Sequence, residues 1–445
     1  MEETKLAAVV MAAGLGTRMH SNVPKHLHPL LGRRMVDWVF EAATSAGVER
    51  LVVVASRTSA DAFGHLEVAV QETPLGTGDA VRSTRAALEG RAEDVLVLSG
   101  DTPLITPELI HELVETHRAA GASATVLAFE LDDPGRYGRI VRDGSGRLAS
   151  IVEAADASDE QLAIREVNSS IYVFRADRLW PVLERLEPKN AQGELYLTDS
   201  VGFLVADGDT VAVHTAADPL DALGVNTRVE LAAAAATLRD RINERHMLAG
   251  VTIDDPGSTW IEPGVEIQPD VVVHPFTVIR GTSKIAAGAD IGPHAVLIDA
   301  VVGERVSVGP FCYLRPGTVL EAEAKAGTFV EIKNAHIGAG AKVPHLSYIG
   351  DAAIGDETNV GAGSITANFP HQEGLPKGKT SVGRNVRVGV NTVFLAPVEV
   401  GDDAWTAAGS VIEEDVPPNA LAIARARQVT KEGRGGKKNG GHGND

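Results

Sequence analysis

Two glycines and two cations near the N-terminus are the first residues whose types and spacing could do chemistry. Gly14 and Gly16 follow the apolar residues 9–13, and Arg18 and Lys25 come shortly after them. Glycine lets backbone N–H groups approach an anion closely, and the two cations supply positive charge beside it. The stretch predicts a phosphate-binding loop. It lacks the third glycine of the dinucleotide fingerprint and the Gly-Lys-Ser/Thr of the P-loop, and an ordinary strand-to-helix turn is the alternative interpretation.

A carboxylate and an amide follow two further apolar stretches. Asp101 comes shortly after residues 95–98, and Asn226 follows a Gly-Val pair. A carboxylate can hold Mg²⁺ and an amide oxygen can add a second ligand, with waters and phosphates completing the octahedron. These two side chains are therefore candidate metal ligands. The alternatives are a helix cap before Pro103 for Asp101 and a turn residue for Asn226.

The elements that must position these residues alternate between short apolar runs and helical patterns from residue 5 to about 229. Runs typical of strands buried on both faces occupy residues 51–55, 95–98, 124–128 and 170–174. Helical patterns at 35–46 and 107–120 lie between them. This order predicts a doubly wound, Rossmann-like α/β domain, whose strand ends collect ligands.

After Gly250 the apolar period changes to six residues. A helix over 229–250, with Leu238 and Ile242 on its apolar stripe, is expected to connect the two halves. The six-residue spacing is found among Ile267, Val273, Ile279, Ile285, Ile291 and Leu297, and it returns in Val382, Val388, Phe394, Val400, Thr406 and Ile412. It is typical of a left-handed parallel β-helix of hexapeptide repeats. The expected domains are 1–228, the helix 229–250, the β-helix 251–431 and a disordered tail 432–445.

Charge and cysteine content narrow the class of protein. A net charge of −19 argues against nucleic acid or an anionic membrane as the main partner. The single cysteine, Cys312, excludes an internal disulfide framework and fits a reducing compartment. No apolar run is long enough to span a membrane, and no basic segment precedes the first one. We expect a cytoplasmic protein.

Short polar and glycine-containing segments mark both halves of the chain. Those in the first half are residues 9–19, 75–78, 99–101, 137–140, 166–168 and 224–226, with Gln71 and Glu153. Those in the second half are residues 314–317, 331–334 and 344–348, with Asn359. Through these segments nearly the whole chain resembles the bifunctional N-acetylglucosamine-1-phosphate uridylyltransferase/glucosamine-1-phosphate N-acetyltransferase family (GlmU). The resemblance implies acetyl transfer from acetyl-CoA to glucosamine 1-phosphate in the β-helix. Uridylyl transfer from UTP to N-acetylglucosamine 1-phosphate, with release of pyrophosphate, would follow in the first domain.

The resemblance also assigns residues in the first domain. Arg18 and Lys25 would grip the triphosphate and act in catalysis, and Asp101 and Asn226 would hold Mg²⁺. Gln71, Gly76 and Thr77 match uracil-reading positions. The implied binding set for UTP and the nucleotide sugar comprises Ala12, Ala13, Gly14, Lys25, Gln71, Gly76, Thr77, Asp101, Gly138, Glu153, Asn168 and Asn226, in which Gly138, Glu153 and Asn168 match acetamido-sugar positions.

In the second domain the resemblance makes His345 the general base that accepts a proton from the sugar amine, a role that suits the ordinary pKa of histidine. Residues implied to bind the sugar phosphate are Arg315, Lys333, Tyr348 and Asn359. Those implied to contact acetyl-CoA are Asn368, Phe369, Val390, Ala408 and Arg425. The prism also resembles acyltransferases that form homotrimers and share each active site between subunits.

Three departures from the family pattern leave alternatives open. The family usually shows Asn-Tyr-Asp-Gly where this chain has Asn-Phe-Pro-His at residues 368–371, and Val390 stands in place of a frequent serine. In the first domain Ser170 replaces a common glycine. One alternative is a monofunctional sugar-1-phosphate nucleotidyltransferase whose β-helix only assembles or regulates. A more distant one is a non-catalytic scaffold.

Overall fold

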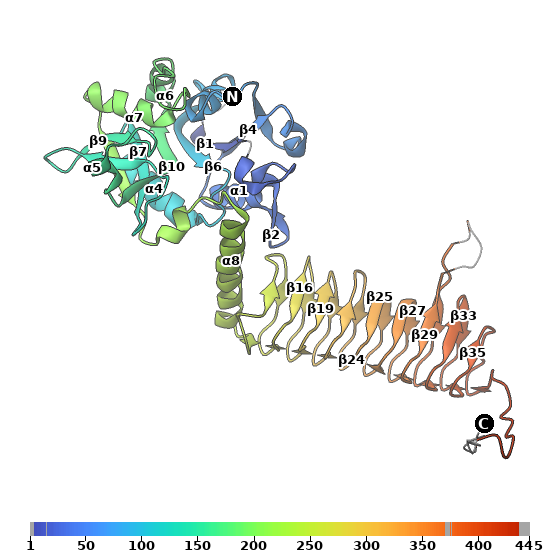
Figure 1. Cartoon of the computed structure of the whole chain (residues 1–445). Coiled ribbons are helices and arrows are strands. Elements are labelled where there is room, and N and C mark those ends of the chain that lie inside the picture. The colour runs from blue at the N-terminus through green and yellow to red at the C-terminus, as the bar shows by residue number, and fades with distance from the viewer. Residues whose placement is uncertain (1–3, 15, 370–373, 375, 436–445) are drawn as a thin grey trace, which may run out of the picture. The chain divides into compact units, whose positions relative to one another are not determined.

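The chain forms two compact units, Met1–Leu238 and Arg239–Asp445, each with its own core. This computed structural model describes residues 4–14, 16–369, 374 and 376–435, and Figure 1 shows the course of the chain. Helix α8 (Arg228–Leu248) crosses the division between the units. Most of the tail predicted at 432–445 lies outside the described residues.

The first unit is built on a mixed β-sheet. Its main strands in spatial order are β11 (Val211–Thr215), β7 (Ala124–Glu130), β10 (Glu166–Arg175), β6 (Ala92–Ser99), β1 (Thr4–Ala12), β4 (Arg50–Ser56) and β5 (Glu67–Gln71). Strands β8 (Arg139–Arg142) and β9 (Leu148–Val152) extend it beside β10, and β2 (Pro29–Leu30) pairs with β3 (Arg33–Arg34) separately. The strands predicted from the four apolar runs are all present. Strand β10, however, is antiparallel to β6 and β7. The sequence does not predict this direction, because a strand buried on both faces has the same apolar pattern in either direction.

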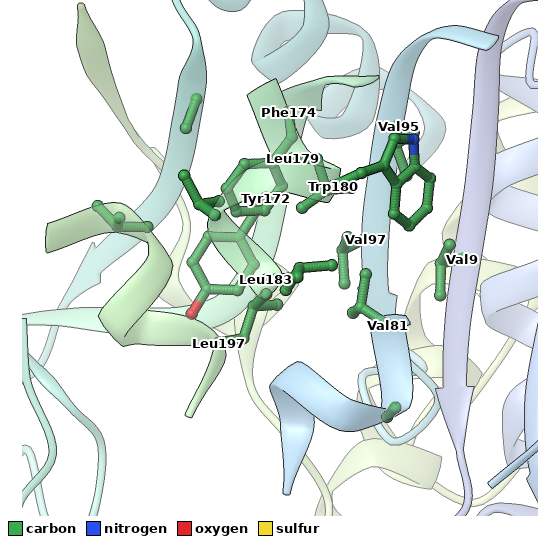
Figure 2. Close-up of a cluster of buried hydrophobic side chains, with 14 of the residues drawn as sticks. Val9, Val81, Val95, Val97, Tyr172, Phe174, Leu179, Trp180, Leu183 and Leu197 are labelled. Atoms are coloured by element: carbon green, nitrogen blue, oxygen red, sulfur yellow. The ribbon is translucent and has the colours of Figure 1, made fainter. Parts of the chain in front are cut away.

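Helices cover both faces of this sheet. Along β1, Val9 belongs to one buried cluster and Val10 to the other, as expected when successive side chains point to opposite faces. One face is covered by α2 (Thr77–Arg82), α3 (Arg85–Leu88), α6 (Ala176–Leu183) and α7 (Leu197–Ala206). The other is covered by α1 (Met35–Ser45) and α4 (Pro107–Ala119), as predicted. Figure 2 shows Trp180 and Leu183 from α6 packed over the strand residues Val95 and Val97.

The carboxyl ends of β1 and β6 lie side by side, because Met11 pairs with Ser99 in the parallel ladder. The glycine loop leaves β1 here and continues through the short 3₁₀ turns Thr17–Met19 and Lys25–Leu27. Gly16 has a φ of +60°, and a Cβ there would lie 2.5 Å from the Lys25 Cβ. Glycine at this position is what allows the loop to close onto Lys25.

The second unit is a prism with three faces, and the strands within each face run parallel to one another. This is the architecture of the predicted β-helix (Figure 1). Face one contains β12 (Thr252–Ile253), β15 (Val272–Val273), β18 (Asp290–Ile291), β21 (Ser307–Val308), β24 (Lys325–Thr328), β26 (Lys342–His345), β28 (Asn359–Val360), β31 (Arg387–Val388), β34 (Trp405–Thr406) and β36 (Leu421–Ala422). Face two contains β13 (Trp260–Ile261), β16 (Val278–Arg280), β19 (Val296–Ile298), β22 (Tyr313–Leu314), β29 (Ile365–Ala367), β32 (Val393–Leu395) and β35 (Val411–Ile412). Face three contains β14 (Glu266–Ile267), β17 (Lys284–Ile285), β20 (Val301–Val302), β23 (Val319–Leu320), β30 (Thr380–Val382) and β33 (Val398–Val400). The longer strands β25 (Glu331–Ile337) and β27 (Tyr348–Ile354) pair with strands of both face two and face three.

Each coil stacks on the next so that residues of the six-residue pattern meet inside the prism. Ile279 pairs beside Leu297, and Leu297 pairs beside Leu314. All three side chains are buried, as predicted. Ile267 is only partly buried, because its strand β14 is at the edge of its face. The stacking gives the outer faces regular columns of residues, which fixes where polar side chains stand.

Within the part of the chain that the structure describes, no helix has the length and apolar character needed to cross a membrane.

Candidate active sites

Four polar side chains predicted from the sequence converge at the end of β1 and β6. The Lys25 ammonium group contacts the Asp101 carboxylate and donates to Asn226 Oδ1 at 2.8 Å. Arg18 donates to the same Asn226 oxygen at 2.9 Å. The side chains of Lys25 and Asp101 are mostly buried, with 14% and 19% exposed. Two cations thus meet two oxygen donors in one place.

Asp101 is held as a carboxylate by its surroundings. Burial alone would raise the pKa of its carboxyl group, but the charge of Lys25 and hydrogen bonds from Lys25 and Ser99 outweigh that effect and hold the pKa below its usual range. Ser99 Oγ donates to Asp101 Oδ1 at 2.6 Å. The Asp101 side chain is therefore ionised at neutral pH and available to a cation.

These residues fit a divalent metal ion. The ammonium group of Lys25 already lies between the oxygens of Asp101 and Asn226, so the two oxygens converge on space for one cation. Both are hard donors of the kind that Mg²⁺ takes. Among the described residues, no group of three or more His, Cys, Asp or Glu side chains is arranged to hold a metal. The other ligands of an ion here would come from phosphates and water.

A cleft of about 590 Å³ opens beside this group. Residues that line it include Ala13, Gly14, Gly16, Arg18, Lys25, Gln71, Gly76, Thr77, Ser99, Asp101 and Ser170. Of the predicted nucleotide-binding set, Ala12 is instead buried in β1, and Asn226 lines a neighbouring cavity. The cleft combines the cations, the carboxylate and the glycine loop, as phosphate chemistry requires.

The positions matched to uracil recognition form one wall of the cleft. Gln71 Nε2 donates to the Gly76 carbonyl at 3.1 Å and to Asp79 Oδ2 at 2.9 Å. Gly76 has a φ of +120°, and a Cβ there would lie 2.6 Å from the Leu195 carbonyl oxygen. Thr77 Oγ1 accepts from the Leu197 N–H at 3.0 Å. This wall is fixed by hydrogen bonds and by a close backbone approach.

Gly138, Glu153 and Asn168 lie near one another but do not line this cleft. The Asn168 N–H donates to the Gly138 carbonyl at 2.9 Å, and a Cβ on Gly138 would lie 3.4 Å from Glu153 Oε2. Burial raises the pKa of Glu153. Asn168 Nδ2 donates to the Tyr172 hydroxyl at 2.8 Å, so this amide is already engaged.

Ser170, which stands where the family has glycine, has a φ of +63°. It lies at an irregularity of the β10–β7 ladder between Asn168 and Tyr172. A left-handed backbone explains why glycine is common at this position, since other residues adopt it at a cost.

In the prism, the predicted general base shares a corner with three of the predicted acetyl-CoA residues. The N–H of Gly363 donates to the His345 carbonyl at 3.3 Å, that of Asn391 to the Ala362 carbonyl at 2.8 Å, and that of Gly409 to the Val390 carbonyl at 2.8 Å. These bonds run from coil to coil and place residues 345, 362, 390 and 408 in one column. A Cβ on Gly409 would lie 4.0 Å from Arg425 Cδ. His345, Val390, Ala408 and Arg425 therefore stand along one edge of the prism.

The predicted sugar-phosphate residues stand mainly on the face next to that edge. Arg315 follows β22, and its N–H donates to the Ile332 carbonyl at 2.8 Å, which places it beside Lys333 on the next coil. Arg315 also donates to Glu331 Oε1 at 2.7 Å, and this hydrogen bond raises the pKa of Arg315. Glu331 pairs with Tyr348 in the ladder. Among the described residues Lys333 has no ion-pair partner, so its charge is available to a ligand.

Of the remaining predicted residues, Asn359 is on another face, and Asn368 is linked through the Asp351 carboxylate to Asn334, the neighbour of Lys333. Asn359 is on face one, between Lys342 and Arg387 in the ladder. Asn368 follows β29 and donates to the Asp351 carboxylate. Phe369 is 74% exposed, and Lys377 Nζ lies 5.9 Å from its ring centroid. Residues 370 and 371, which complete the departure from the family pattern, lie outside the described part of the chain.

Sequence reasoning assigned no role to several side chains that hold these sites together. Ser99 supports Asp101, Glu331 pairs with Arg315, and Thr198 donates to Glu153 Oε1 at 3.3 Å. Ser99 and Glu331 lie inside the segments 99–101 and 331–334 that carry the family resemblance. A polar residue two positions from Asp101 or Lys333 could have been predicted to support the site. Thr198 is forty-five residues from Glu153 and leaves no local signal.

Comparisons with known proteins bear on both units. Residues 8–200 match the model of the MobA-like NTP transferase domain. A protein of Streptomyces avermitilis named Bifunctional protein GlmU is 47% identical over 452 residues, covering 96% of this chain and 93% of its own. The protein of the same name from Corynebacterium efficiens is 44% identical over 466 residues, covering 99% and 95%. The protein of that name from Mycobacterium tuberculosis is 45% identical over 450 residues, covering 95% and 90%. The expected resemblance is confirmed along nearly the whole chain, and the chain belongs to the GlmU family.

Proposed function

We propose that the chain makes UDP-N-acetylglucosamine in two reactions, one in each unit. It is an acetyltransferase that acts on glucosamine 1-phosphate with acetyl-CoA, and a uridylyltransferase that joins UTP to N-acetylglucosamine 1-phosphate. Family membership supports both activities, and the NTP transferase match supports the second. The observation that carries the proposal is the convergence of Arg18, Lys25, Asp101 and Asn226 beside the cleft. The cysteine content favours the cytoplasm as its place of work.

Uridylyl transfer needs the sugar phosphate to attack the α-phosphorus of UTP in line while positive charge neutralises the reacting phosphates. Asp101 and Asn226 would hold Mg²⁺, which would supply positive charge to the triphosphate. Lys25 moves its ammonium group from the oxygens of these two side chains to the phosphates, and Arg18 also binds the phosphates. The wall formed by Gln71, Gly76 and Thr77 receives the base. No covalent protein nucleophile is required.

Acetyl transfer needs a base, a phosphate site and a groove for coenzyme A. His345 accepts the proton that the amine of glucosamine 1-phosphate loses as it attacks the thioester carbonyl, a contribution of about 10² to 10⁴ in rate. As the N–C bond forms, the C–S bond breaks, and coenzyme A leaves as a thiol that takes up this proton. Lys333 and Arg315 bind the sugar phosphate, and Arg315 exchanges its hydrogen bond with Glu331 for one with the phosphate. The edge that carries Val390, Ala408 and Arg425 is proposed to hold the cofactor. Phe369 offers an exposed ring in place of the family's tyrosine.

The prism is proposed to form a homotrimer through an exposed aromatic column. Phe276, His294, Phe311 and Phe329 stack along one corner with ring centroids 4.8, 4.7 and 5.2 Å apart. The three phenylalanines are 56%, 48% and 57% exposed in the single chain. Leu346, next to His345, follows on the same corner and is 62% exposed. Covering this apolar edge with a second copy would place that copy beside His345.

The direct test is to supply the purified protein with each pair of substrates separately. We expect UDP-N-acetylglucosamine and pyrophosphate from UTP and N-acetylglucosamine 1-phosphate only when Mg²⁺ is present. We also expect free coenzyme A from acetyl-CoA and glucosamine 1-phosphate with or without the metal. Uridylyl transfer without acetylation at saturating substrates would support the monofunctional alternative, and neither product would support a scaffold.

A further inference from the structure

Helix α8 begins at Arg228, two residues after Asn226, with a capping box. Thr227 precedes the helix, and its Oγ1 accepts from the Glu230 N–H at 3.2 Å. Glu230 Oε2 in turn accepts from the Thr227 N–H at 2.8 Å. This reciprocal pair is a common way to satisfy the free N–H groups at a helix start. Taken alone it explains only the stability of the helix end.

The Glu230 carboxylate reaches one residue further than a cap requires. The same Oε2 atom accepts from the Asn226 N–H at 2.6 Å. Asn226 is the residue whose Oδ1 receives both Lys25 and Arg18. Glu230 therefore fixes the backbone of the amide that the two cations of the active site share.

The backbone N–H groups of the two preceding residues also donate hydrogen bonds. The Val225 N–H donates to the Asp101 carbonyl at 2.8 Å, and the Gly224 N–H donates to the Tyr137 hydroxyl at 3.0 Å. Three consecutive N–H groups are thus bound by three different residues, and only Asp101 belongs to the catalytic group. Tyr137 and Glu230 line a second cavity of about 600 Å³, while Arg18 lines both cavities.

We propose that Glu230 is a positioning residue for nucleotidyl transfer, which sets the place of the Asn226 amide oxygen through the Asn226 backbone. The inference rests on the proposed function, because it takes Asn226 to serve the metal and the phosphates. Misplacing a binding group by about 1 Å can cost about 10²-fold in rate. A hydrogen bond at the backbone of Asn226 can therefore matter to the reaction without touching a reactant.

The test compares Glu230→Ala with Glu230→Gln and with a matched cap elsewhere. The glutamine keeps a carbonyl oxygen that can accept from both N–H groups, whereas the alanine removes the acceptor. The control is Gln161→Ala, because Gln161 forms the capping box of α5 (Asp159–Leu162), where the Ser158 N–H donates to Gln161 Oε1 at 2.9 Å. We expect about a tenfold to hundredfold loss of uridylyl kcat in Glu230→Ala, with a higher Mg²⁺ concentration for half-activation. Glu230→Gln and Gln161→Ala should stay near wild type.

Three further measurements separate positioning from simple helix capping. Thermal unfolding reports the loss of a cap in both alanine variants, acetyl transfer reports an intact second unit, and calorimetric titration with UTP and Mg²⁺ reports the site without turnover. Weaker binding in Glu230→Ala alone supports the inference. An unchanged kcat and binding constant, with only a lowered melting temperature, would overturn it. If Glu230→Ala does not fold, Glu230→Asp, which is one methylene too short, carries the same comparison. A wild type that lacks uridylyl transfer would instead remove the proposed function itself.

Discussion

At the scale of single residues, Lys25 is the side chain on which most of the first site depends. It contacts both candidate metal ligands, and Gly16 is packed against its Cβ. The sequence predicted Lys25, Asp101 and Asn226 as site residues because each lies within a few residues of an apolar strand or in a segment that contains glycine. Their chemistry and their place near a strand end could therefore both be predicted. It assigned no function to Glu230, although Thr-Arg-Val-Glu is a capping-box pattern that predicts a helix start. Only the structure shows the carboxylate bonded to Asn226 as well.

Gly16→Ala should abolish most uridylyl transfer. The new Cβ would meet Lys25 at 2.5 Å, and the φ of +60° is costly for alanine by about 1 to 2 kcal/mol. Gly47→Ala is the matched control, because Gly47 has a φ of +89° and a Cβ added there would meet nothing within 4 Å. Steady-state kinetics and thermal unfolding of both variants provide the check. Equal activity in the two would mean that contact with Lys25 is unimportant.

His26, the neighbour of Lys25, makes the first unit sensitive to acid. Burial lowers its pKa from 6.5 to about 4. Between pH 6.5 and 4 the unfolded chain binds a proton that the folded chain does not. The free energy of unfolding should therefore decrease by up to about 3 kcal/mol as the pH is lowered from 6.5 to 4. Above pH 6.5 this contribution is constant. Denaturant unfolding of His26→Leu should show a flatter pH dependence in the window than wild type, and parallel curves would contradict this account of His26.

At the scale of elements, the sequence predicted the structures of the two units to different degrees. The six-residue pattern predicted the prism because each strand packs the interior with one apolar side chain, and this side chain recurs every six residues. In the first unit strands β4, β6, β7 and β10 were predicted from their apolar runs, whereas β5, β8, β9 and β11 were not. The antiparallel direction of β10 was not predicted either, because a strand that is covered on both faces has the same apolar run in either direction. The aromatic column was also overlooked. Its signal is a spacing of seventeen or eighteen residues between Phe276, His294, Phe311 and Phe329, which equals one coil.

Leu297→Ala tests the packing of the prism. Leu297 is fully buried between Ile279 and Leu314, so truncation should cost about 2 to 5 kcal/mol of unfolding free energy. Val301→Ala, on a side chain that is 44% exposed, should cost about 0.5 kcal/mol or less. The unfolding transition of the second unit, followed by its loss of acetyl transfer, measures both. Similar costs for the two changes would argue against the inward column.

At the scale of the whole molecule, the proposed trimer gives a role to an apolar edge that a single chain leaves exposed. Phe311→Ser places a polar group in the middle of the aromatic column. We expect sedimentation velocity to show smaller species, with acetyl transfer reduced and uridylyl transfer retained, because the residues that line the first cleft all belong to the first unit. A Phe311→Leu variant keeps the apolar surface and should remain assembled. A wild type that is monomeric and fully active in both reactions would contradict the assembly.

A crossed pair of substitutions tests most directly whether one chain carries two independent active sites. Asp101→Asn removes the charge that Lys25 and Ser99 hold in place, and His345→Ala removes the proposed base in the prism. Both reactions are measured on both variants at saturating substrates and Mg²⁺. We predict that Asp101→Asn loses uridylyl transfer and keeps acetyl transfer, and that His345→Ala does the reverse. Loss of both activities in either variant, or acetyl transfer that survives His345→Ala, would contradict this account.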